Sequence, residues 1–259
     1  MNVEKVVDHI VDWLTAYSNN SGTSGFVVGV SGGIDSAVTS ALCARTGIDT
    51  ICVEMPIHQS KAQVSRAVKH IEYLITGHAN VRRMEIELTP TFESFKSTLP
   101  EIENNDMALI NTRARIRMTA LYYVAGAEGK IVVGTGNKVE DFGVGFFTKY
   151  GDGGVDVSPI ADLNKTEVYA LGDFLGVNDQ IMDAPPTDGL WGDNRTDEDQ
   201  IGASYPELEW AMEQQDLGKA IDDFEGRQKE VYAIYTRLNW INQHKMVPIP
   251  VCVIPAELR

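Results

Sequence analysis

The stretch Gly29-Val30-Ser31-Gly32-Gly33-Ile34-Asp35-Ser36 decides how the first half of this sequence is expected to fold. The apolar run Phe26-Val27-Val28 precedes it and predicts a buried strand, whereas residues 37–44 predict a helix. A strand, a Ser/Gly-rich turn and a helix N-terminus direct several backbone N–H groups to one point. The positive end of the helix dipole lies at the same point, so the stretch predicts an anion site, most often for phosphate.

The loop differs from the common phosphate loop, whose Gly-x-x-x-x-Gly-Lys-Ser/Thr pattern supplies a lysine to the terminal phosphates. Here an acid, Asp35, stands in the turn. A carboxylate that faces phosphates normally needs a divalent cation between them, so Asp35 predicts a Mg²⁺ ligand. The pattern Ser-Gly-Gly-x-Asp-Ser resembles the pyrophosphate loop of enzymes that split ATP into AMP and pyrophosphate. A plain glycine turn between a strand and a helix is the alternative.

Length and composition are typical of one α/β domain, and we expect residues 1–259 to form a single domain. The net charge of −15 argues against nucleic acid as a partner, because nucleic acid needs a basic surface. No apolar stretch approaches the roughly 20 residues that cross a bilayer, and the N-terminus lacks the apolar core of a signal peptide. Three widely spaced cysteines, Cys43, Cys52 and Cys252, fit neither a disulfide framework nor a zinc site. We therefore expect a cytoplasmic protein that does not contact membranes.

Hydrophobic periodicity predicts alternating helices and strands along the first two thirds of the chain. This order indicates a doubly wound parallel sheet with helices on both faces, in which ligands bind at the carboxyl ends of the strands. Two stretches, 135–159 and 184–205, lack periodicity and are candidate active-site loops, with a plain surface loop as the alternative for the second. The expected helices are 2–18, 60–75, 91–98, 105–127 and 165–175, the last capped by Asn164 with Glu167, and the expected strands include 50–56, 83–88 and 130–134.

Two polar positions follow the strand at 130–134. Thr135 comes directly after Gly134, and Glu140 lies five residues beyond Thr135. If this strand neighbours the one before Ser31, then Asp35 and Glu140 can hold one Mg²⁺ from two sides, since Mg²⁺ usually takes one or two carboxylates plus phosphate oxygens and water. A solvated surface charge is the alternative for Glu140.

The block Gly145-Phe146-Phe147-Thr148-Lys149-Tyr150-Gly151-Asp152-Gly153-Gly154-Val155-Asp156 is the most discriminating part of the chain. Its glycines let backbone approach a ligand, its aromatic rings offer a stacking face, and Lys149 is a cation for phosphate. Together with the loop upstream and His244-Lys245 downstream, this block resembles the NAD synthetase family, in the same order over nearly the whole chain. The resemblance implies an adenine nucleotide alpha hydrolase-like fold.

The resemblance also implies site residues at the matching positions. Asp35 and Glu140 match the family's Mg²⁺ ligands, and Asp35 and Lys165 are the expected catalytic residues. In the helix 105–127, the position of the motif selects Arg115 for the dinucleotide, while Arg113 and Arg117 point to the other side at 100° per residue and are expected to be surface or ion-pair residues. ATP is expected on Gly29, Val30, Ser31, Gly32, Gly33, Ile34, Asp35, Ser36, Thr135, Lys165 and Thr187, and deamido-NAD on Arg115, Lys149, Asp156, His244 and Lys245.

The reaction that the resemblance implies is amidation of deamido-NAD (nicotinic acid adenine dinucleotide) by ammonia. ATP is split to AMP and pyrophosphate through an adenylated dinucleotide, because a free carboxylate lacks an adequate leaving group. Residues 1–24 leave no room for a glutaminase domain, which favours free ammonia or ammonia from a separate protein. A GMP-synthetase-like or tRNA-thiolating enzyme and a non-catalytic nucleotide-binding module are the alternatives.

The family is typically a homodimer, so we expect one here. The apolar positions of the helix 105–127 fit either a subunit interface or contact with the sheet. They are Ile110, Ala114, Met118, Leu121 and Ala125.

Overall fold

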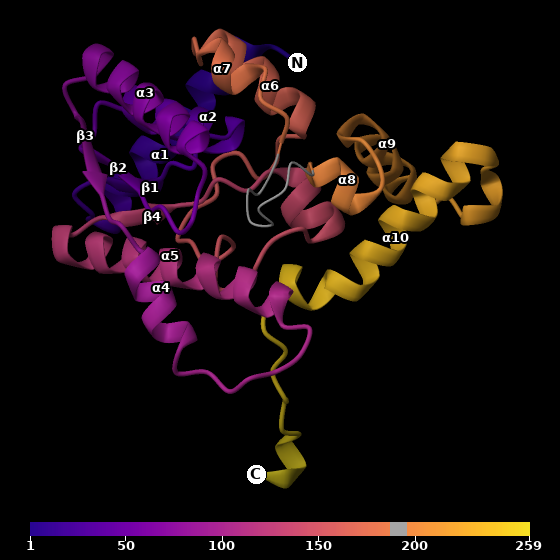
Figure 1. Cartoon of the computed structure of the whole chain (residues 1–259). Helices are drawn as coiled ribbons and strands as arrows, with labels where there is room; N and C mark the ends of the chain where they lie inside the picture. The colour runs from indigo at the N-terminus through magenta and orange to yellow at the C-terminus, as the bar shows by residue number, and fades with distance from the viewer. Residues whose placement is uncertain (187–195) are drawn as a thin grey trace.

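A four-stranded parallel sheet forms the centre of the computed structural model, which describes residues 1–186 and 196–259. The strand order is β3-β2-β1-β4, with Val28 of β1 opposite Cys52 of β2 and Val133 of β4 (Figure 1). The order reverses between β1 and β4, and ligands of such sheets bind beyond the carboxyl ends of the strands at this point. The strands are β1 (Phe26–Gly29), β2 (Thr50–Glu54), β3 (Val81–Glu85) and β4 (Ile131–Val133).

Helices cover both faces of the sheet, as the sequence predicts. Because side chains alternate along a strand, Phe26 and Val28 of β1 pack into one core, while Val27 packs into the other. The first core is completed by α1 (Val3–Ser21), α2 (Ile34–Arg45), α3 (Lys61–Gly77), α6 (Lys165–Phe174) and α7 (Asp179–Met182). The second is completed by α4 (Thr89–Lys96) and α5 (Asp106–Glu128). The doubly wound α/β fold is therefore confirmed.

The predicted elements lie within a few residues of their observed bounds. The capping box of α6 is present, since the Asn164 N–H donates to Glu167 Oε2 at 3.0 Å. The strand predicted at 83–88 is observed at Val81–Glu85. Cys43 and Cys52 are buried free thiols.

The apolar positions of α5, the longest of the described helices, fall into two groups. Leu121 and Ala125 pack in the core beneath the sheet, whereas Ile110, Ala114 and Met118 line the cavity described below. The outer face of α5 carries Tyr123, which is 76% exposed. No helix of the described residues has the length and apolarity that crossing a membrane requires.

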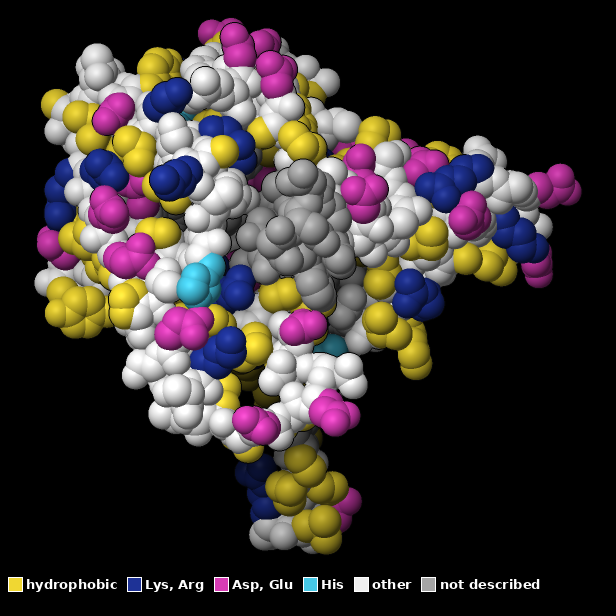
Figure 2. Space-filling model, in the orientation of Figure 1, with side chains coloured by type: hydrophobic (Ala, Val, Ile, Leu, Met, Phe, Trp, Pro, Cys, Tyr) yellow, Lys and Arg dark blue, Asp and Glu magenta, His cyan; other side chains and the backbone are white. Residues whose placement is uncertain are grey.

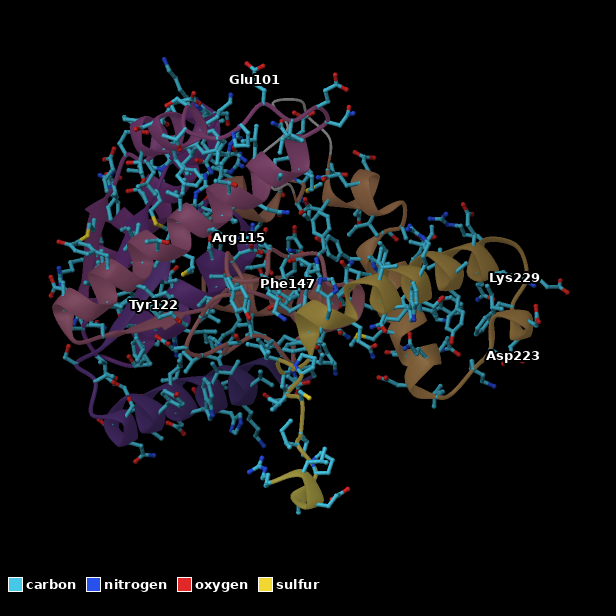
Figure 3. All side chains as sticks on the ribbon, turned by 90° about the horizontal axis from the view of Figure 1, so that it is seen from below. Glu101, Arg115, Tyr122, Phe147, Asp223 and Lys229 are labelled. Atoms are coloured by element: carbon cyan, nitrogen blue, oxygen red, sulfur yellow. The ribbon has the colours of Figure 1, made fainter. Side chains whose placement is uncertain are left out.

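A third core lies apart from the sheet and is formed by one short helix from the middle of the chain and by helices that follow residue 196. We call this part the helical cluster: η1 (Lys138–Val144), α8 (Asp197–Ile201), α9 (Tyr205–Asp216), η2 (Ile221–Asp223) and α10 (Gly226–Met246). In Figure 3, Asp223 and Lys229 mark its outer end, whereas Phe147 lies where the cluster meets the rest of the molecule. The stretches expected as loops at 135–159 and 184–205 thus contain two short helices, η1 and α8. After α10 the chain leaves the body and ends with η3 (Ala256–Leu258) (Figure 1).

Candidate active site

The turn between β1 and α2 has the geometry of an anion-binding loop. Gly32 has a φ of 85°, and a Cβ at this residue would lie 2.7 Å from the Gln63 carbonyl oxygen, so only glycine fits. Ser36 Oγ donates to the Gly33 carbonyl oxygen at 3.0 Å and accepts from the Ser31 N–H at 3.2 Å. Among the described residues no side chain caps the N-terminus of α2, which leaves its first N–H groups to an anion.

Beside this loop, Lys165 joins the two acids that the sequence pairs. Its Nζ lies 2.6 Å from Asp35 Oδ2 and 2.9 Å from Glu140 Oε1, and its side chain is only 4% exposed. Asn137 donates to Asp35 Oδ1 at 3.1 Å, and the Tyr205 hydroxyl donates to Glu140 Oε1. We call Asp35, Lys165 and Glu140 the charged triad.

The electrostatics of the charged triad follow from its burial. Burial and the neighbouring Glu140 raise the pKa of Asp35, and Lys165 offsets only part of this effect. Burial acts on Glu140 in the same direction, but Lys165 and the hydrogen bond from Tyr205 outweigh it and lower the pKa of Glu140. Burial alone would lower the pKa of Lys165, yet the two carboxylates raise it, so this ammonium stays charged. The triad carries three charged groups with one net negative charge, and it attracts further positive charge.

The donor set of the triad fits Mg²⁺. One oxygen of Asp35 and one of Glu140 converge on a single point, and the ammonium of Lys165 now occupies that point as a cation. Two carboxylates are the usual protein share of a Mg²⁺ site whose other ligands are phosphate oxygens and water. Asp35 and Glu140 are therefore brought together as the sequence predicts.

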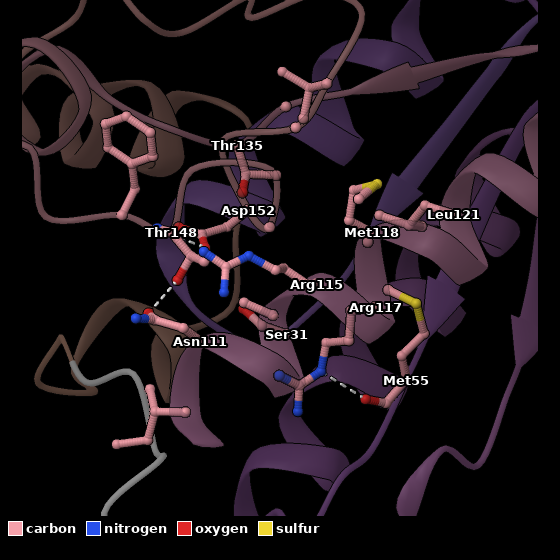
Figure 4. A pocket seen from close by; sticks show the side chains of 18 of the residues that line it. Ser31, Met55, Asn111, Arg115, Arg117, Met118, Leu121, Thr135, Thr148 and Asp152 are labelled. Atoms are coloured by element: carbon pink, nitrogen blue, oxygen red, sulfur yellow. Dashed lines mark hydrogen bonds between the residues drawn. The ribbon is translucent and has the colours of Figure 1, made fainter. Parts of the chain in front are cut away.

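A cavity of about 750 Å³ extends from the anion-binding loop to the end of α10. Figure 4 shows Ser31 and Thr135 on its wall together with Arg115, Arg117 and Met55. The predicted ATP residues that line it are Gly29, Val30, Ser31 and Thr135, and the predicted dinucleotide residues that line it are Arg115, Lys149, His244 and Lys245. Gly32, Gly33, Ile34, Asp35 and Ser36 follow Ser31 along the loop and the start of α2.

The predicted dinucleotide residues contact one another across three segments. Arg115 Nε of α5 donates to the Lys149 carbonyl oxygen at 3.3 Å, and Lys149 Nζ donates to the His244 carbonyl oxygen at 2.6 Å. Lys245 Nζ donates to the carbonyl oxygens of Gly145 and Phe147, the latter at 2.9 Å. These contacts place four cationic or titratable side chains at one end of the cavity.

One of the predicted dinucleotide residues does not join this group. Asp156 lies at the edge of the sheet, where its carboxylate accepts from the Val132 N–H at 2.8 Å and from the Tyr122 hydroxyl at 2.9 Å. It is not among the described residues that line the cavity. Thr187 lies outside the described residues.

The expectation that only one arginine face of the helix 105–127 meets the site is wrong. Arg115 and Arg117 both line the cavity, because α5 runs along its wall and presents both flanks to it. Arg117 Nε donates to the Met55 carbonyl oxygen at 2.9 Å, and burial together with the charge of Arg113 lowers the pKa of Arg117 to about 10. Arg113 packs its guanidinium over the Phe92 ring instead.

Sequence reasoning missed three further residues. Asp152 stands in the glycine-rich block, and Figure 4 shows it near Arg115. Arg117 lies two residues from the selected position of the helix, on its other flank, and its residue type was the available signal. Tyr205 has no local signal, because only the fold brings it to Glu140.

An anion-binding loop at the switch point of a doubly wound sheet, beside a buried acid pair with a lysine, defines an α/β nucleotide-binding protein of the pyrophosphate-loop class. Comparison with known proteins gives the family. The family model for NAD synthase matches residues 6–248, and the chain belongs to the NAD synthase family. It is an enzyme, a ligase that forms a C–N bond.

Similar proteins cover almost the whole chain. The NH3-dependent NAD+ synthetase of Archaeoglobus fulgidus is 39% identical, over 86% of this chain and 88% of that protein. The NH3-dependent NAD+ synthetase of Alkaliphilus metalliredigens is 37% identical, over 96% and 99%. Among solved structures, the NMN synthetase of Francisella tularensis is 30% identical over 99% of both chains, with a TM-score of 0.82.

Proposed function

We propose that this enzyme uses ATP and ammonia to amidate the nicotinate carboxylate of deamido-NAD, giving NAD, AMP and pyrophosphate. One observation carries the proposal: a single cavity joins the anion-binding loop at Ser31 to the cations Arg115, Lys149 and Lys245. A nucleotide triphosphate and a second anionic substrate can therefore meet in it. The names of the NH3-dependent relatives support the same reaction.

In this mechanism the nicotinate carboxylate attacks the α-phosphorus of ATP, and pyrophosphate leaves with the electron pair of the broken P–O bond. Ammonia then attacks the acyl carbon of the adenylated dinucleotide, AMP leaves, and a proton is lost from nitrogen. No side-chain nucleophile is needed, so the protein contributes position and charge.

The residues of the loop and the triad have distinct parts in this scheme. The N–H groups at the start of α2 bind the phosphates and hold the α-phosphorus in place. Asp35 and Glu140 would hold Mg²⁺, which neutralises charge on phosphate oxygens when bound. Lys165 stays protonated beside these carboxylates when they hold Mg²⁺, and its charge stabilises the departing pyrophosphate.

The direct test is incubation of the purified protein with ATP, Mg²⁺, ammonium chloride and deamido-NAD, with NAD and pyrophosphate followed together. We expect the two products in equal amounts. Pyrophosphate without NAD would indicate a different acceptor, as in a GMP-synthetase-like enzyme, and neither product would favour a nucleotide-binding module. Comparable rates with glutamine in place of ammonium would contradict ammonia as the donor.

Nicotinic acid mononucleotide is a second candidate acceptor, because the solved NMN synthetase matches 99% of this chain. It carries the same nicotinate carboxylate and lacks the adenylate half. Measuring kcat/KM for the two acceptors side by side separates the candidates. A higher value for the mononucleotide would replace deamido-NAD as the substrate.

We also propose a homodimer. The exposed apolar side chains Tyr123, Trp240 and Val251, each at least 76% exposed, support it because a partner would remove them from water. Sedimentation equilibrium of the purified protein tests this, and a monomer across micromolar concentrations would contradict it.

A further inference from the structure

We propose that α9 positions the charged triad, with Tyr205 and Glu209 acting through Glu140 and Lys165 rather than on substrate. The inference deepens the proposed function and rests on it where activity is concerned. Both residues lie on α9 four positions apart, so they share one face of the helix. Both are buried, at 4% and 9% exposure.

Tyr205 contacts two members of the triad at once. Its hydroxyl donates to Glu140 Oε1, the same oxygen that accepts from Lys165. Its ring centroid lies 4.8 Å from Lys165 Nζ, within the range of a cation–π contact. One side chain therefore fixes the orientation of the Glu140 carboxylate and supports the ammonium beside it.

Glu209 holds the backbone that carries Lys165. Its carboxylate accepts from the Thr166 N–H at 2.9 Å and from Thr166 Oγ1 at 2.7 Å. Thr166 directly follows Lys165 in the first turn of α6, where N–H groups lack partners within the helix. The negative charge of Glu209 also suits the positive end of the helix dipole.

The residues around α9 bury these contacts in a packed core. Tyr205 and Leu208 pack in the core of the helical cluster, which also holds Val139 and Val144 of η1 on either side of Glu140. Plain packing of a core tyrosine would not require its hydroxyl to reach a carboxylate. The same core supplies a comparison, because Tyr232 is equally buried and its hydroxyl donates to the Lys219 carbonyl oxygen, outside the triad.

The two matched variants are Tyr205→Phe and Tyr232→Phe, each of which removes one buried hydroxyl from one core. In Tyr205→Phe we expect kcat for pyrophosphate release to fall about tenfold, since one hydrogen bond to a charged group is lost. The Mg²⁺ concentration for half-maximal rate should rise several-fold, and KM for deamido-NAD should stay unchanged. Tyr232→Phe should shift neither kinetic quantity, although both variants can lose stability.

Binding of Mn²⁺ without nucleotide gives a readout that does not depend on the reaction. Electron paramagnetic resonance of free Mn²⁺ should show several-fold weaker binding to Tyr205→Phe than to Tyr232→Phe. Equal Mn²⁺ binding and equal kinetics in these two variants would overturn the positioning role. A wild-type protein that releases no pyrophosphate would instead contradict the proposed function, while the Mn²⁺ comparison still tests α9.

Glu209 is tested against an acid of the same helix. Glu209→Ala should lower kcat about tenfold, because the Thr166 N–H and hydroxyl lose their partner beside Lys165. Glu209→Gln, which keeps one acceptor oxygen, should recover part of this loss. Glu213→Ala removes an exposed acid of α9 and should leave kcat unchanged. Equal kcat in Glu209→Ala and Glu213→Ala would contradict the role of Glu209.

Discussion

Two regions contribute residues to the same site: the sheet with its two cores, and the helical cluster. They position these residues in different ways. The sheet side places Asp35 and the anion-binding loop by local geometry, within one turn between β1 and α2. The cluster places Glu140, Tyr205 and Lys245 by contacts between distant parts of the chain. Asn242 Nδ2, for example, donates to the Val144 carbonyl oxygen at 2.8 Å over 98 residues. Binding groups of the first kind can be read from a short motif, and those of the second kind depend on the whole fold.

The two regions meet at Lys165, which pairs with Asp35 on one side and with Glu140 on the other. The cavity also borders both regions, from Ser31 to Lys245. On the face in Figure 2, the Lys and Arg side chains of the described residues are interspersed with Asp and Glu. Positive charge for anionic substrates therefore comes from individual cations in the cavity, such as Arg115, Lys149 and Lys245.

The largest expected effect comes from removing the ion pair between Asp35 and Lys165, which lies on the sheet side of the site. Asp35→Asn keeps the size of the side chain but removes one of the two negative charges that converge on Lys165. Because Asp35 is also a proposed Mg²⁺ ligand in the first turn of α2, beside the anion-binding loop, we expect pyrophosphate release to fall roughly 1,000-fold. The measurement is pyrophosphate release at saturating ATP, with circular dichroism to confirm folding.

Asp162→Asn is the matched control. Its side chain is 99% exposed and pairs with Lys138, so the same change of charge is made away from the cavity. We expect near wild-type rates for this variant. Folded Asp35→Asn with wild-type pyrophosphate release would favour a nucleotide-binding module that does not cleave ATP.

The sequence predicted the sheet side well because its signals are local. Strand Phe26–Gly29 and the turn at Gly32 can be read from neighbouring residues, and the capping box at Asn164 needs only four positions. Pairing of Asp35 with Glu140 was also predictable, since both follow strands whose carboxyl ends share one edge of a parallel sheet.

The helical cluster was less predictable. No pattern within α9 indicates that Tyr205 reaches Glu140, which lies 65 residues earlier. The helical wheel separated Arg115 from Arg117, yet both border the cavity because α5 runs along it. Periodicity tells which side of a helix is apolar, but it does not tell how wide a cavity the neighbouring elements leave.

Low pH should decrease the free energy of unfolding through His70 on the sheet side. This side chain is buried, and its Nε2 lies 3.0 Å from Ser40 Oγ. Burial lowers the pKa of His70 from 6.5 to about 4. Between these values the unfolded chain binds a proton that the folded protein does not, so stability is lost as pH falls from 6.5 to about 4. The whole window corresponds to about 3 kcal/mol.

Urea unfolding of the wild type and of His70→Leu at several pH values measures this loss. Leucine has no titrating group, so its free energy of unfolding should depend less steeply on pH in that window. In the helical cluster, burial raises the pKa of Tyr235, so this tyrosine stays neutral over the same range. Equal pH slopes for the wild type and His70→Leu would show that His70 is not the acid-sensitive group.

A glycine with a positive φ can be replaced by alanine in each region, Gly32 on the sheet side and Gly145 beside the helical cluster. Gly32→Ala forces a φ of 85° on alanine and brings its Cβ to 2.7 Å from the Gln63 carbonyl oxygen. Gly145→Ala forces a φ of 65° and brings its Cβ to 2.5 Å from Asn242 Cβ. Each should lose about 2 kcal/mol in the free energy of unfolding.

The kinetic effects of the two glycine variants should differ. Gly32→Ala should raise KM for ATP, and Gly145→Ala should raise KM for deamido-NAD, because they distort opposite ends of the cavity. Gly126→Ala, whose Cβ would meet nothing within 4 Å in α5, is the control and should gain up to about 1 kcal/mol. A shared change in both KM values would mean that the two regions respond as one unit.

The smallest effect concerns the choice among the arginines of α5. Arg115 lines the cavity and contacts the Lys149 carbonyl oxygen, whereas Arg113 stacks on Phe92. Arg115→Met should therefore raise KM for deamido-NAD about tenfold, the size of one charge-assisted hydrogen bond, while Arg113→Met should leave it unchanged. Arg117→Met should act on ATP instead, because Arg117 contacts Met55 next to the carboxyl end of β2. Substrate-dependent initial rates for the three variants decide the assignment. Equal KM values for deamido-NAD in Arg115→Met and Arg113→Met would remove Arg115 from the dinucleotide site and leave Lys149 and Lys245 as its cations.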